Sequence, residues 1–196
     1  MTRSPSVLAS FYLLDKPVSA NFVISCTGAF VGSNSSSREI SSPEDRSHLV
    51  HLRSQASAVI VGGNTARLEA YSPTSRFETY VFSKGLNSPE GLTHLQFQNR
   101  SDLQQLFKEI AAKHKRVLVE SGPRLLNQFL DERLIDTVFL SIVHQTENCT
   151  CVLASVDDPK LIEALARSLL RIPTRARATS MISGRTVLTR FDCGEP

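Results

Sequence analysis

The stretch that decides the fold is Lys115-Arg-Val-Leu-Val-Glu-Ser-Gly-Pro-Arg-Leu-Leu126, an apolar segment followed by a glycine and a proline. Its run Val117–Val119 is typical of a buried strand. Gly122 has no Cβ, so a ligand can approach the backbone closely, and Pro123 suits the first position of a helix. The N–H groups and positive dipole end of such a helix favour a diphosphate. One glycine falls short of a dinucleotide fingerprint, so an ordinary turn is an equal alternative for this motif alone.

A second apolar segment ends in the same way. It reads Ala58-Val-Ile-Val-Gly-Gly-Asn-Thr65, with two glycines and two small polar residues at its end. Two parallel strands that each end in glycine would present two backbone surfaces to one extended ligand at the carboxyl edge of a sheet. The pair therefore favours a nucleotide site over two ordinary turns.

Length and charge limit the class of protein. A chain of 196 residues with 41% hydrophobic content can build one domain with a full core. The net charge of +3 is too small to indicate nucleic-acid binding and supports only a modest preference for small anions. The apolar run from Val7 to Leu14 is too short for a membrane span and lacks a convincing cleavage site. We expect a cytoplasmic protein with an N-terminal segment (residues 1–20) and a single domain (residues 21–196).

Metal and disulfide sites are not indicated. The chain has four cysteines, Cys26, Cys149, Cys151 and Cys193. Their spacing fits neither a zinc site nor a disulfide framework, and in a cytosolic protein they are expected to be reduced thiols. His48 and His51 lie three residues apart on a predicted helix, but no third ligand is evident, so we expect solvated side chains and no metal.

Strands and helices are predicted to alternate along the chain. The predicted strands cover residues 21–26, 58–61, 79–83, the run at Val117, and 137–143, with a terminal hairpin over 179–191. The predicted helices cover residues 44–55, 102–113, 123–133 and 159–170. We expect Ser101 and Gln104 to form a capping box on the second helix. The alternation predicts a mostly parallel sheet covered by helices on both faces, with an antiparallel edge.

Six short motifs follow one another in a recognisable order. They are Ser25-Cys-Thr-Gly28, Ile40-Ser-Ser-Pro43, Leu52-Arg53 with Ser57-Ala58, Val61-Gly-Gly-Asn-Thr65, Val119-Glu-Ser-Gly-Pro-Arg-Leu-Leu126, and Leu134-Ile-Asp136. In this order they resemble the reductase domain of the riboflavin-biosynthesis deaminase/reductase family, from Asn21 to the end of the chain. The resemblance implies an α/β, three-layer dihydrofolate-reductase-like fold, with a mostly parallel central sheet and an antiparallel C-terminal edge hairpin. It also implies a homodimer.

The resemblance implies an NADPH site as well, because the family uses NADPH to reduce the ribose carbon of a phosphoribosylamino-pyrimidine. Ser83 and Lys84 would hold the 2′-phosphate, for which a hydroxyl and an ammonium are suited. For Lys84, an exposed turn lysine is an equal alternative. The residues expected at the nicotinamide half and its phosphates are Gly62, Gly63, Asn64 and Thr65, and those expected at the diphosphate are Ser121, Gly122, Pro123, Arg124 and Leu125.

The substrate side departs from the family pattern. Asn21 stands where the family has a lysine, Thr27 where it has an acid, and Glu39 where it has a tryptophan. The family's Asp-Asn/Asp-Pro-Arg-Leu-Thr appears as Glu69-Ala-Tyr-Ser-Pro-Thr74, which lacks the arginine and its bidentate phosphate contact. The substrate-binding candidates carried over by position are Asn21, Ser25, Thr27, Ser41 and Thr74.

Two carboxylates are the candidate catalytic groups. Glu69 and Glu120 are the acids nearest the expected site, and burial at a strand end would raise the pKa of Glu120. An equal alternative for Glu120 is a carboxylate that only accepts hydrogen bonds in the turn. Three functions fit the sequence: an NADPH-dependent reductase, a nucleotide-binding paralogue that has lost the ancestral reaction, and, more weakly, a pterin reductase.

Overall fold

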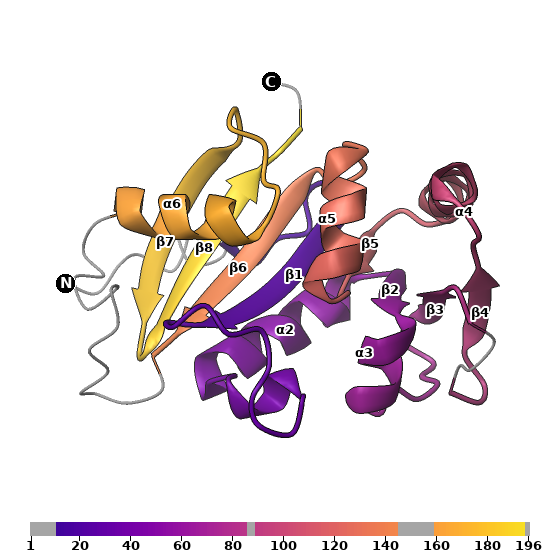
Figure 1. The fold of residues 1–196 in the computed structure, drawn as a ribbon, viewed down its shortest axis with the longest axis horizontal. Helices are drawn as coiled ribbons and strands as arrows, with labels where there is room; N and C mark the ends of the chain where they lie inside the picture. The colour runs from indigo at the N-terminus through magenta and orange to yellow at the C-terminus, as the bar shows by residue number, and fades with distance from the viewer. Residues whose placement is uncertain (1–10, 86–88, 145–158, 195–196) are drawn as a thin grey trace.

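An eight-stranded sheet forms the centre of the protein (Figure 1), in the order β4-β3-β2-β5-β1-β6-β8-β7. The computed structural model describes residues 11–85, 89–144 and 159–194. The strands are β1 (Val18–Ser25), β2 (Ala58–Gly62), β3 (Glu78–Ser83), β4 (Thr93–Gln96), β5 (Val117–Val119), β6 (Thr137–Val143), β7 (Arg177–Ser183) and β8 (Thr186–Asp192). The strands from β4 to β6 in this order pair in parallel, whereas β8 is antiparallel to both β6 and β7. The predicted parallel sheet with an antiparallel edge hairpin is confirmed.

Helices cover both faces of the sheet. They are η1 (Ser37–Glu39), α2 (Pro43–Gln55), α3 (Gly63–Leu68), α4 (Arg100–Lys113), α5 (Pro123–Asp131) and α6 (Pro159–Leu169). Side chains of α4, α5 and α6 pack on one face, where Phe107 and Phe129 are almost fully buried. On the other face, a second core cluster includes Leu52 of α2, Ala66 of α3 and Phe139 of β6. The three-layer α/β arrangement predicted by the resemblance is confirmed.

The helix starts follow local capping chemistry, with one correction. Ser42 caps α2 by accepting a hydrogen bond from the Asp45 N–H at 3.1 Å. The capping box of α4 is formed by Asn99 and Asp102, so the prediction of Ser101 and Gln104 was wrong. The helix begins at Arg100, which places Ser101 inside the first turn, where it cannot act as the cap.

Several element limits were not predicted. The short helix α3 and the edge strand β4 are absent from the sequence prediction, because α3 begins with a glycine and β4 has no buried apolar run. Strand β1 begins at Val18, so the predicted domain start at residue 21 falls inside the strand. Leu14 is 1% exposed and packs in the same core as α2, and the N-terminal segment is therefore part of the fold from at least that residue.

Strand β5 is the shortest strand of the sheet. Its three residues pair with Val18–Ala20 of β1 on one side and with Ala58–Ile60 of β2 on the other. Both neighbours continue past the point where β5 stops, β1 as far as Ser25 and β2 as far as Gly62. The end of β5 therefore leaves an opening between its two neighbours at the carboxyl edge of the sheet.

His48 is buried, which corrects the prediction of a solvated side chain. It is 2% exposed, and its ring lies 4.6 Å from that of Tyr12 and 5.5 Å from that of Phe139, centroid to centroid. Neither ring nitrogen has a hydrogen-bond partner among the described residues. The prediction failed because Tyr12, from the N-terminal segment, covers this face of α2. His51 is exposed, as expected.

Other expectations concern metals, thiols and membranes. Within the described residues, no group of three or more His, Cys, Asp or Glu side chains is placed to hold a metal ion. Cys26 and Cys193 are buried, and Cys149 and Cys151 lie outside the described residues. No helix in the described ranges has the length and apolar character needed to cross a membrane.

His48 should make stability depend on pH. Burial lowers the pKa of His48 to about 4, and the nearby His51 charge adds to the shift. The unfolded chain, with an ordinary histidine pKa of about 6.5, takes up the proton first. The stability that depends on a neutral His48 is thus fully present above about pH 6.5 and is lost as the pH falls towards 4. By pH 4.5 the wild type should lose about 2 to 3 kcal/mol more stability than His48→Leu.

Urea unfolding of both proteins at pH 7.5, 6 and 4.5 measures this difference. His51→Leu is the matched control on the exposed side of the same helix, and it should keep most of the wild-type pH dependence, because burial is the larger cause of the His48 pKa shift. An equal pH dependence in wild type and His48→Leu would contradict the prediction.

Candidate functional site

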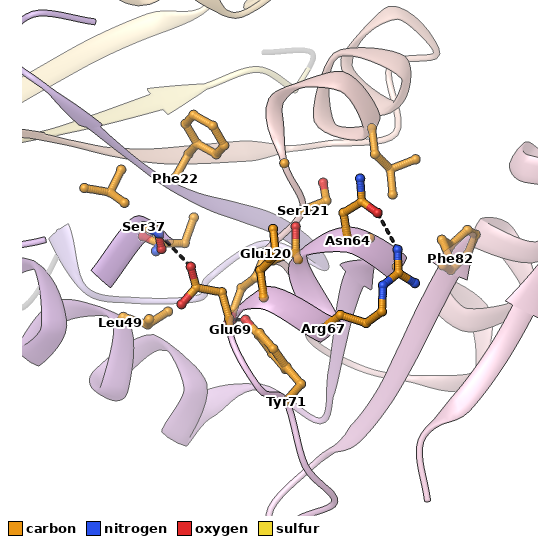
Figure 2. A pocket seen from close by; sticks show the side chains of 18 of the residues that line it. Phe22, Ser37, Leu49, Asn64, Arg67, Glu69, Tyr71, Phe82, Glu120 and Ser121 are labelled. Atoms are coloured by element: carbon orange, nitrogen blue, oxygen red, sulfur yellow. Dashed lines mark hydrogen bonds between the residues drawn. The ribbon is translucent and has the colours of Figure 1, made fainter. Parts of the chain in front are cut away.

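A large cavity opens where β5 stops. Its volume is about 1520 Å³, and residues at the carboxyl ends of β2, β3 and β5 line it. Figure 2 shows Glu120 and Ser121 between Leu49 at one end of the cavity and Phe82 at the other. Pockets for single small ligands usually measure about 300–1,000 Å³. The cavity therefore has room for an extended ligand and a second molecule.

The residues predicted to bind the cofactor come together in this cavity. All eleven of them line it: Gly62, Gly63, Asn64, Thr65, Ser83, Lys84, Ser121, Gly122, Pro123, Arg124 and Leu125. They come from the ends of three neighbouring strands and from the starts of α3 and α5. Gly62 is the N-cap of α3 and Gly122 the N-cap of α5, and neither end carries a side-chain cap hydrogen bond. Two uncapped helix N-termini at one cavity favour an anionic ligand.

Neither of these two glycines is required by the backbone. Gly62 has φ −79° and Gly122 has φ −60°, values that any residue can adopt. An added Cβ at Gly122 would lie 3.7 Å from Thr65 Oγ1, and one at Gly62 would lie 3.6 Å from Leu125 Cδ2, both ordinary contacts. A side chain at either position would instead take up space at the cavity wall. The bare backbone therefore fits a ligand that lies directly against it.

Gly63 has a different role. A Cβ there would lie 2.8 Å from the Ser83 Cβ, too close for real side chains. The absence of a side chain allows α3 to pack tightly against β3. Gly63 is thus needed for the fold as well as lining the cavity.

Ser121 offers an unused polar group. It is 3% exposed, it lines the cavity, and its Oγ has no hydrogen-bond partner among the described residues. A buried hydroxyl without a partner costs free energy unless a ligand or water completes it. Ser121 therefore fits a ligand with polar oxygen atoms at the start of α5.

The far end of the cavity lies beside β3 and β4. Phe82 and Phe97 line it, and the Lys84 Nζ lies 6.0 Å from the Phe97 ring centroid. The Ser83 hydroxyl donates to the Gly85 carbonyl at 2.6 Å and accepts from the Gly85 N–H at 3.0 Å. Ser83 is thus already engaged in its own turn, whereas Lys84 and Arg67 are exposed cations that line the cavity.

Glu120 is held in a buried ion pair. Its two carboxylate oxygens accept from Arg53 Nε at 2.8 and 3.1 Å, and the Tyr71 hydroxyl also donates to it. Arg53 Nη2 donates to that hydroxyl at 2.7 Å. Burial and the charge of Glu120 raise the pKa of Tyr71 well above its ordinary value, so the phenol stays protonated. Burial of Arg53 opposes its charge, but the hydrogen bonds and charge of Glu120 outweigh this and raise its pKa.

Glu69 is also fully engaged. Its Oε1 accepts from the Ser37 N–H at 2.7 Å and from Ser36 Oγ at 3.0 Å, and its Oε2 lies 3.3 Å from Arg38 Nε. Figure 2 shows the Ser37 hydrogen bond as a dashed line. Glu69 thereby ties the end of α3 to η1 along the cavity rim. Glu69 and Glu120 are thus both engaged in ion pairs and hydrogen bonds, which fits a positioning role, and their catalytic assignment stays a prediction.

The substrate-binding candidates separate into two groups. Asn21, Ser41 and Thr74 line the cavity, but Ser25 and Thr27 do not. The Ser25 and Thr27 hydroxyls bond to each other at 2.7 Å, and the Ala29 N–H donates to Ser25 Oγ at 3.0 Å. These two residues therefore stabilise the turn after β1, outside the cavity lining. The turn-forming pattern Ser-x-Thr-Gly is a sequence signal for this role.

Sequence reasoning missed three lining residues with polar functions, Asp45, Arg53 and Tyr71. Arg53 was noted only as part of a motif. Its partner lies 67 residues away, so no local pattern reveals the pair. Asp45 lies in the first turn of α2, where an acidic residue suits the helix dipole, so the local sequence does not reveal its place in the cavity lining.

Comparison with known proteins agrees with the fold and with the first block of motifs. The model of the RibD C-terminal domain family matches residues 16–89, and it confirms the resemblance to this reductase domain. No curated protein sequence matches the chain significantly.

Solved structures show the same fold. A pyrimidine reductase-like protein from Corynebacterium diphtheriae superposes with a TM-score of 0.61 at 17% identity, covering 91% of this chain and 92% of that chain. A bifunctional deaminase and 5-amino-6-(5-phosphoribosylamino)uracil reductase from Thermotoga maritima gives 0.60 at 15% identity, covering 90% and 56%. Dihydrofolate reductase from Enterococcus faecalis, complexed with NADP(H), gives 0.58 at 10% identity, covering 90% and 96%. The chain thus has the dihydrofolate-reductase-like fold.

The Arg53–Glu120 pair should contribute to stability as a unit. Glu120→Gln should lower the free energy of unfolding by about 1 to 3 kcal/mol, because it leaves a partly buried guanidinium without its charged partner. Arg53→Gln should lower the free energy of unfolding by a similar amount. The double variant should lose about 1 kcal/mol less than the sum of the losses in the two single variants.

Denaturant unfolding of the two single variants and the double variant measures this coupling. Glu78→Gln, which removes the exposed partner of Lys113, is the control and should change stability by less than about 0.5 kcal/mol. Strict additivity of the Arg53 and Glu120 variants would show that the pair does not act as described.

Proposed function

We propose that the protein is an NADPH-dependent reductase of the pyrimidine reductase type. It would transfer hydride to the ribose carbon of a pyrimidine ribotide, or reduce a related small substrate. The observation that carries the proposal is that two helix N-termini meet at one cavity. Each has a glycine as its N-cap residue and lacks a side-chain cap hydrogen bond. The family match and the shared fold support the same class of reaction.

The chain's residues fit a dinucleotide with phosphates at the centre of the cavity. The bare backbone at Gly62 and Gly122 would lie against the diphosphate, and the unpartnered Ser121 hydroxyl would donate to a phosphate oxygen. Lys84 would face the 2′-phosphate at the far end, beside the aromatic rings of Phe82 and Phe97. When bound, NADPH supplies the hydride.

The residues of the protein would also align the cofactor with the substrate. Arg53 and Tyr71 fix the Glu120 side chain, which holds the strand end directly before Ser121 and Gly122. Glu69 fixes η1 at the rim beside the expected substrate end. Both carboxylates would thus orient the two halves of the site, and correct orientation is a large part of hydride-transfer catalysis.

A second candidate is a nucleotide-binding protein without the ancestral reaction. The engagement of both Glu69 and Glu120 in ion pairs favours it, because neither is available to transfer a proton. We further propose that the protein acts as a homodimer in the cytoplasm, which light scattering and cell fractionation would test.

Titration with NADPH and with NADH tests the proposed function. The chain contains no tryptophan, so the fluorescence of the reduced nicotinamide can be followed without overlap from that residue. Loss of nicotinamide absorbance after addition of the pyrimidine ribotide would support the reductase. Binding without turnover would support the nucleotide-binding protein, and absence of binding would contradict both.

Gly122→Asp should separate stability from cofactor affinity. Gly122 has the extended backbone of an N-cap, where aspartate is a favoured residue, so stability should be unchanged or rise by a few tenths of a kcal/mol. The same carboxylate would occupy the expected diphosphate position, so NADPH affinity should fall by about tenfold or more.

Thermal unfolding and NADPH titration of the variant measure the two effects. Gly122→Ala is the matched control and should lose less affinity, because it adds a Cβ without a charge. Unchanged NADPH affinity in a folded Gly122→Asp protein would refute this placement of the diphosphate.

Lys84→Met should change the choice of cofactor. Removal of the ammonium should weaken NADPH binding by about tenfold to a hundredfold, because a charge-assisted phosphate contact is lost. NADH binding should change little, because NADH lacks the 2′-phosphate. The measurement is the ratio of the two dissociation constants. Lys108→Met, on the exposed face of α4, is the control and should leave this ratio unchanged, and the same ratio in Lys84→Met would rule out Lys84 as the phosphate ligand.

A further inference from the structure

The cavity wall includes a short polar segment between β1 and α2, residues 32–39, which we call the rim segment. Its sequence is Gly-Ser-Asn-Ser-Ser-Ser-Arg-Glu, without a large apolar side chain to anchor it. Ser35, Ser37 and Arg38 line the cavity, whereas the other five residues lie outside its lining. Burial contributes little to the order of such a segment, so hydrogen bonds must keep it in one conformation.

Glu39, the last residue of the rim segment, holds it through a single carboxylate. Its Oε2 accepts from Ser33 Oγ at 3.1 Å and from the Asn34 N–H at 3.1 Å. The side-chain amide of Asn34 donates to its Oε1. The Asn34 N–H is the largest of the causes that lower the pKa of Glu39, so the carboxylate is charged at neutral pH. The start of the segment is thereby bound to its end.

The backbone of the rim segment is shaped to fit this carboxylate. A Cβ at Gly32 would overlap the Glu39 side chain, whose Cδ would lie only 2.8 Å away, so a glycine leaves room for it. Ser35 has φ +59°, in the left-handed region that serine rarely adopts. Its N–H donates to the Gly32 carbonyl at 3.1 Å, and the Gly32 N–H donates to the Ser36 carbonyl at 3.0 Å. Such a turn persists only where its surroundings hold it.

A second carboxylate fixes the rim segment from outside. Glu69, at the end of α3, accepts from the Ser36 hydroxyl and the Ser37 N–H (Figure 2) and pairs with Arg38. Glu69 thus contacts residues 36–38, whereas Glu39 contacts residues 33 and 34. The two carboxylates therefore have different effects. Glu69 attaches the segment to α3, and Glu39 sets the path of the chain inside the segment.

We propose that Glu39 is a positioning residue for the substrate: its carboxylate folds the rim segment so that Ser37 and Arg38 face the cavity, without touching the ligand itself. A hydroxyl and a guanidinium are groups that hold polar or anionic oxygen atoms. Glu39 stands where the family that the chain resembles has a tryptophan, so this carboxylate-centred loop follows from the chain's own sequence. The inference rests on the proposed function only in calling the ligand the substrate.

An exchange of two side chains isolates this role. Asn34→Asp places a second carboxylate against Glu39, and repulsion between the like charges should loosen the segment. Asn34→Asp combined with Glu39→Gln exchanges the amide and the carboxylate between the same two positions, so it should restore the hydrogen bonds. Glu39→Ala removes the acceptor altogether. Glu39→Gln alone should keep most of the hydrogen bonds, because the Asn34 amide can rotate to present its oxygen.

Steady-state kinetics with NADPH and the pyrimidine ribotide measure the effect. In Asn34→Asp and in Glu39→Ala, KM for the ribotide should rise about threefold to tenfold, while kcat and the dissociation constant for NADPH change less than about twofold. Glu39→Gln and the exchanged double variant should stay within about twofold of the wild-type KM. Amide hydrogen exchange of residues 32–39 should be faster in the two loosened variants and should return to the wild-type rate in the double variant.

Glu109→Ala is the matched control. It removes an exposed carboxylate of α4 that accepts from the Gln105 amide at 3.0 Å and lies outside the cavity lining, so it should match the wild type in every measurement. An unchanged KM in Asn34→Asp and Glu39→Ala, or a double variant that does not restore it, would overturn the proposal. Equal losses of affinity for the ribotide and for NADPH would also overturn it, because they would show a general loss of structure.

The proposed function and this inference fail in different ways. A wild type that does not bind NADPH, or does not reduce the ribotide, would refute the reductase activity. Calorimetric titration with the ribotide then decides the inference, because its dissociation constant should follow the same order across the variants as the expected KM. A wild type that does not bind the ribotide would overturn the inference as well.

Discussion

The early end of strand β5 is the constraint from which the site follows. Its three residues pair on both sides with longer strands, and the polypeptide then leaves the sheet at Glu120. The edges of β1 and β2 beyond that point have no strand between them. The turn from Glu120 to Gly122 and the two helix N-termini therefore come together at one opening, as expected for an α/β sheet whose ligand lies outside the carboxyl ends of its strands.

The Arg53–Glu120–Tyr71 network holds together the elements that surround this opening. Arg53 comes from the last turn of α2, Glu120 from the end of β5, and Tyr71 from the loop after α3. A glutamate that is 6% exposed at the side chain would be costly without a charged partner, and its loss would leave the three elements without their common contact. The same network explains why Glu120 positions the backbone beside Ser121 and is not a free acid.

The two halves of the cavity differ in the kind of group that would hold a ligand. Beside α3 and α5 the lining includes the glycines at the two helix N-termini, so its shape there depends on the path of the backbone. The lining from β1 and α2 includes polar side chains such as Asn21 and Asp45. The sequence keeps the glycine turns of the family that it resembles and departs from that family at Asn21, Thr27 and Glu39.

Apolar runs and glycine positions act locally, and from them the sequence by itself determined the alternating elements and the parallel sheet with its edge hairpin. The eleven cavity-lining residues followed from the resemblance of its motifs to a reductase family. The tertiary structure alone decided which side chains are buried and which partners they bind. His48 is buried because a tyrosine 36 positions away covers it, and Glu69 and Glu120 are engaged by partners 31 and 67 residues away. Ser25 and Thr27 bond to each other instead of facing the cavity. Burial and pairing between distant residues arise only when the elements pack, so they cannot be read from local patterns.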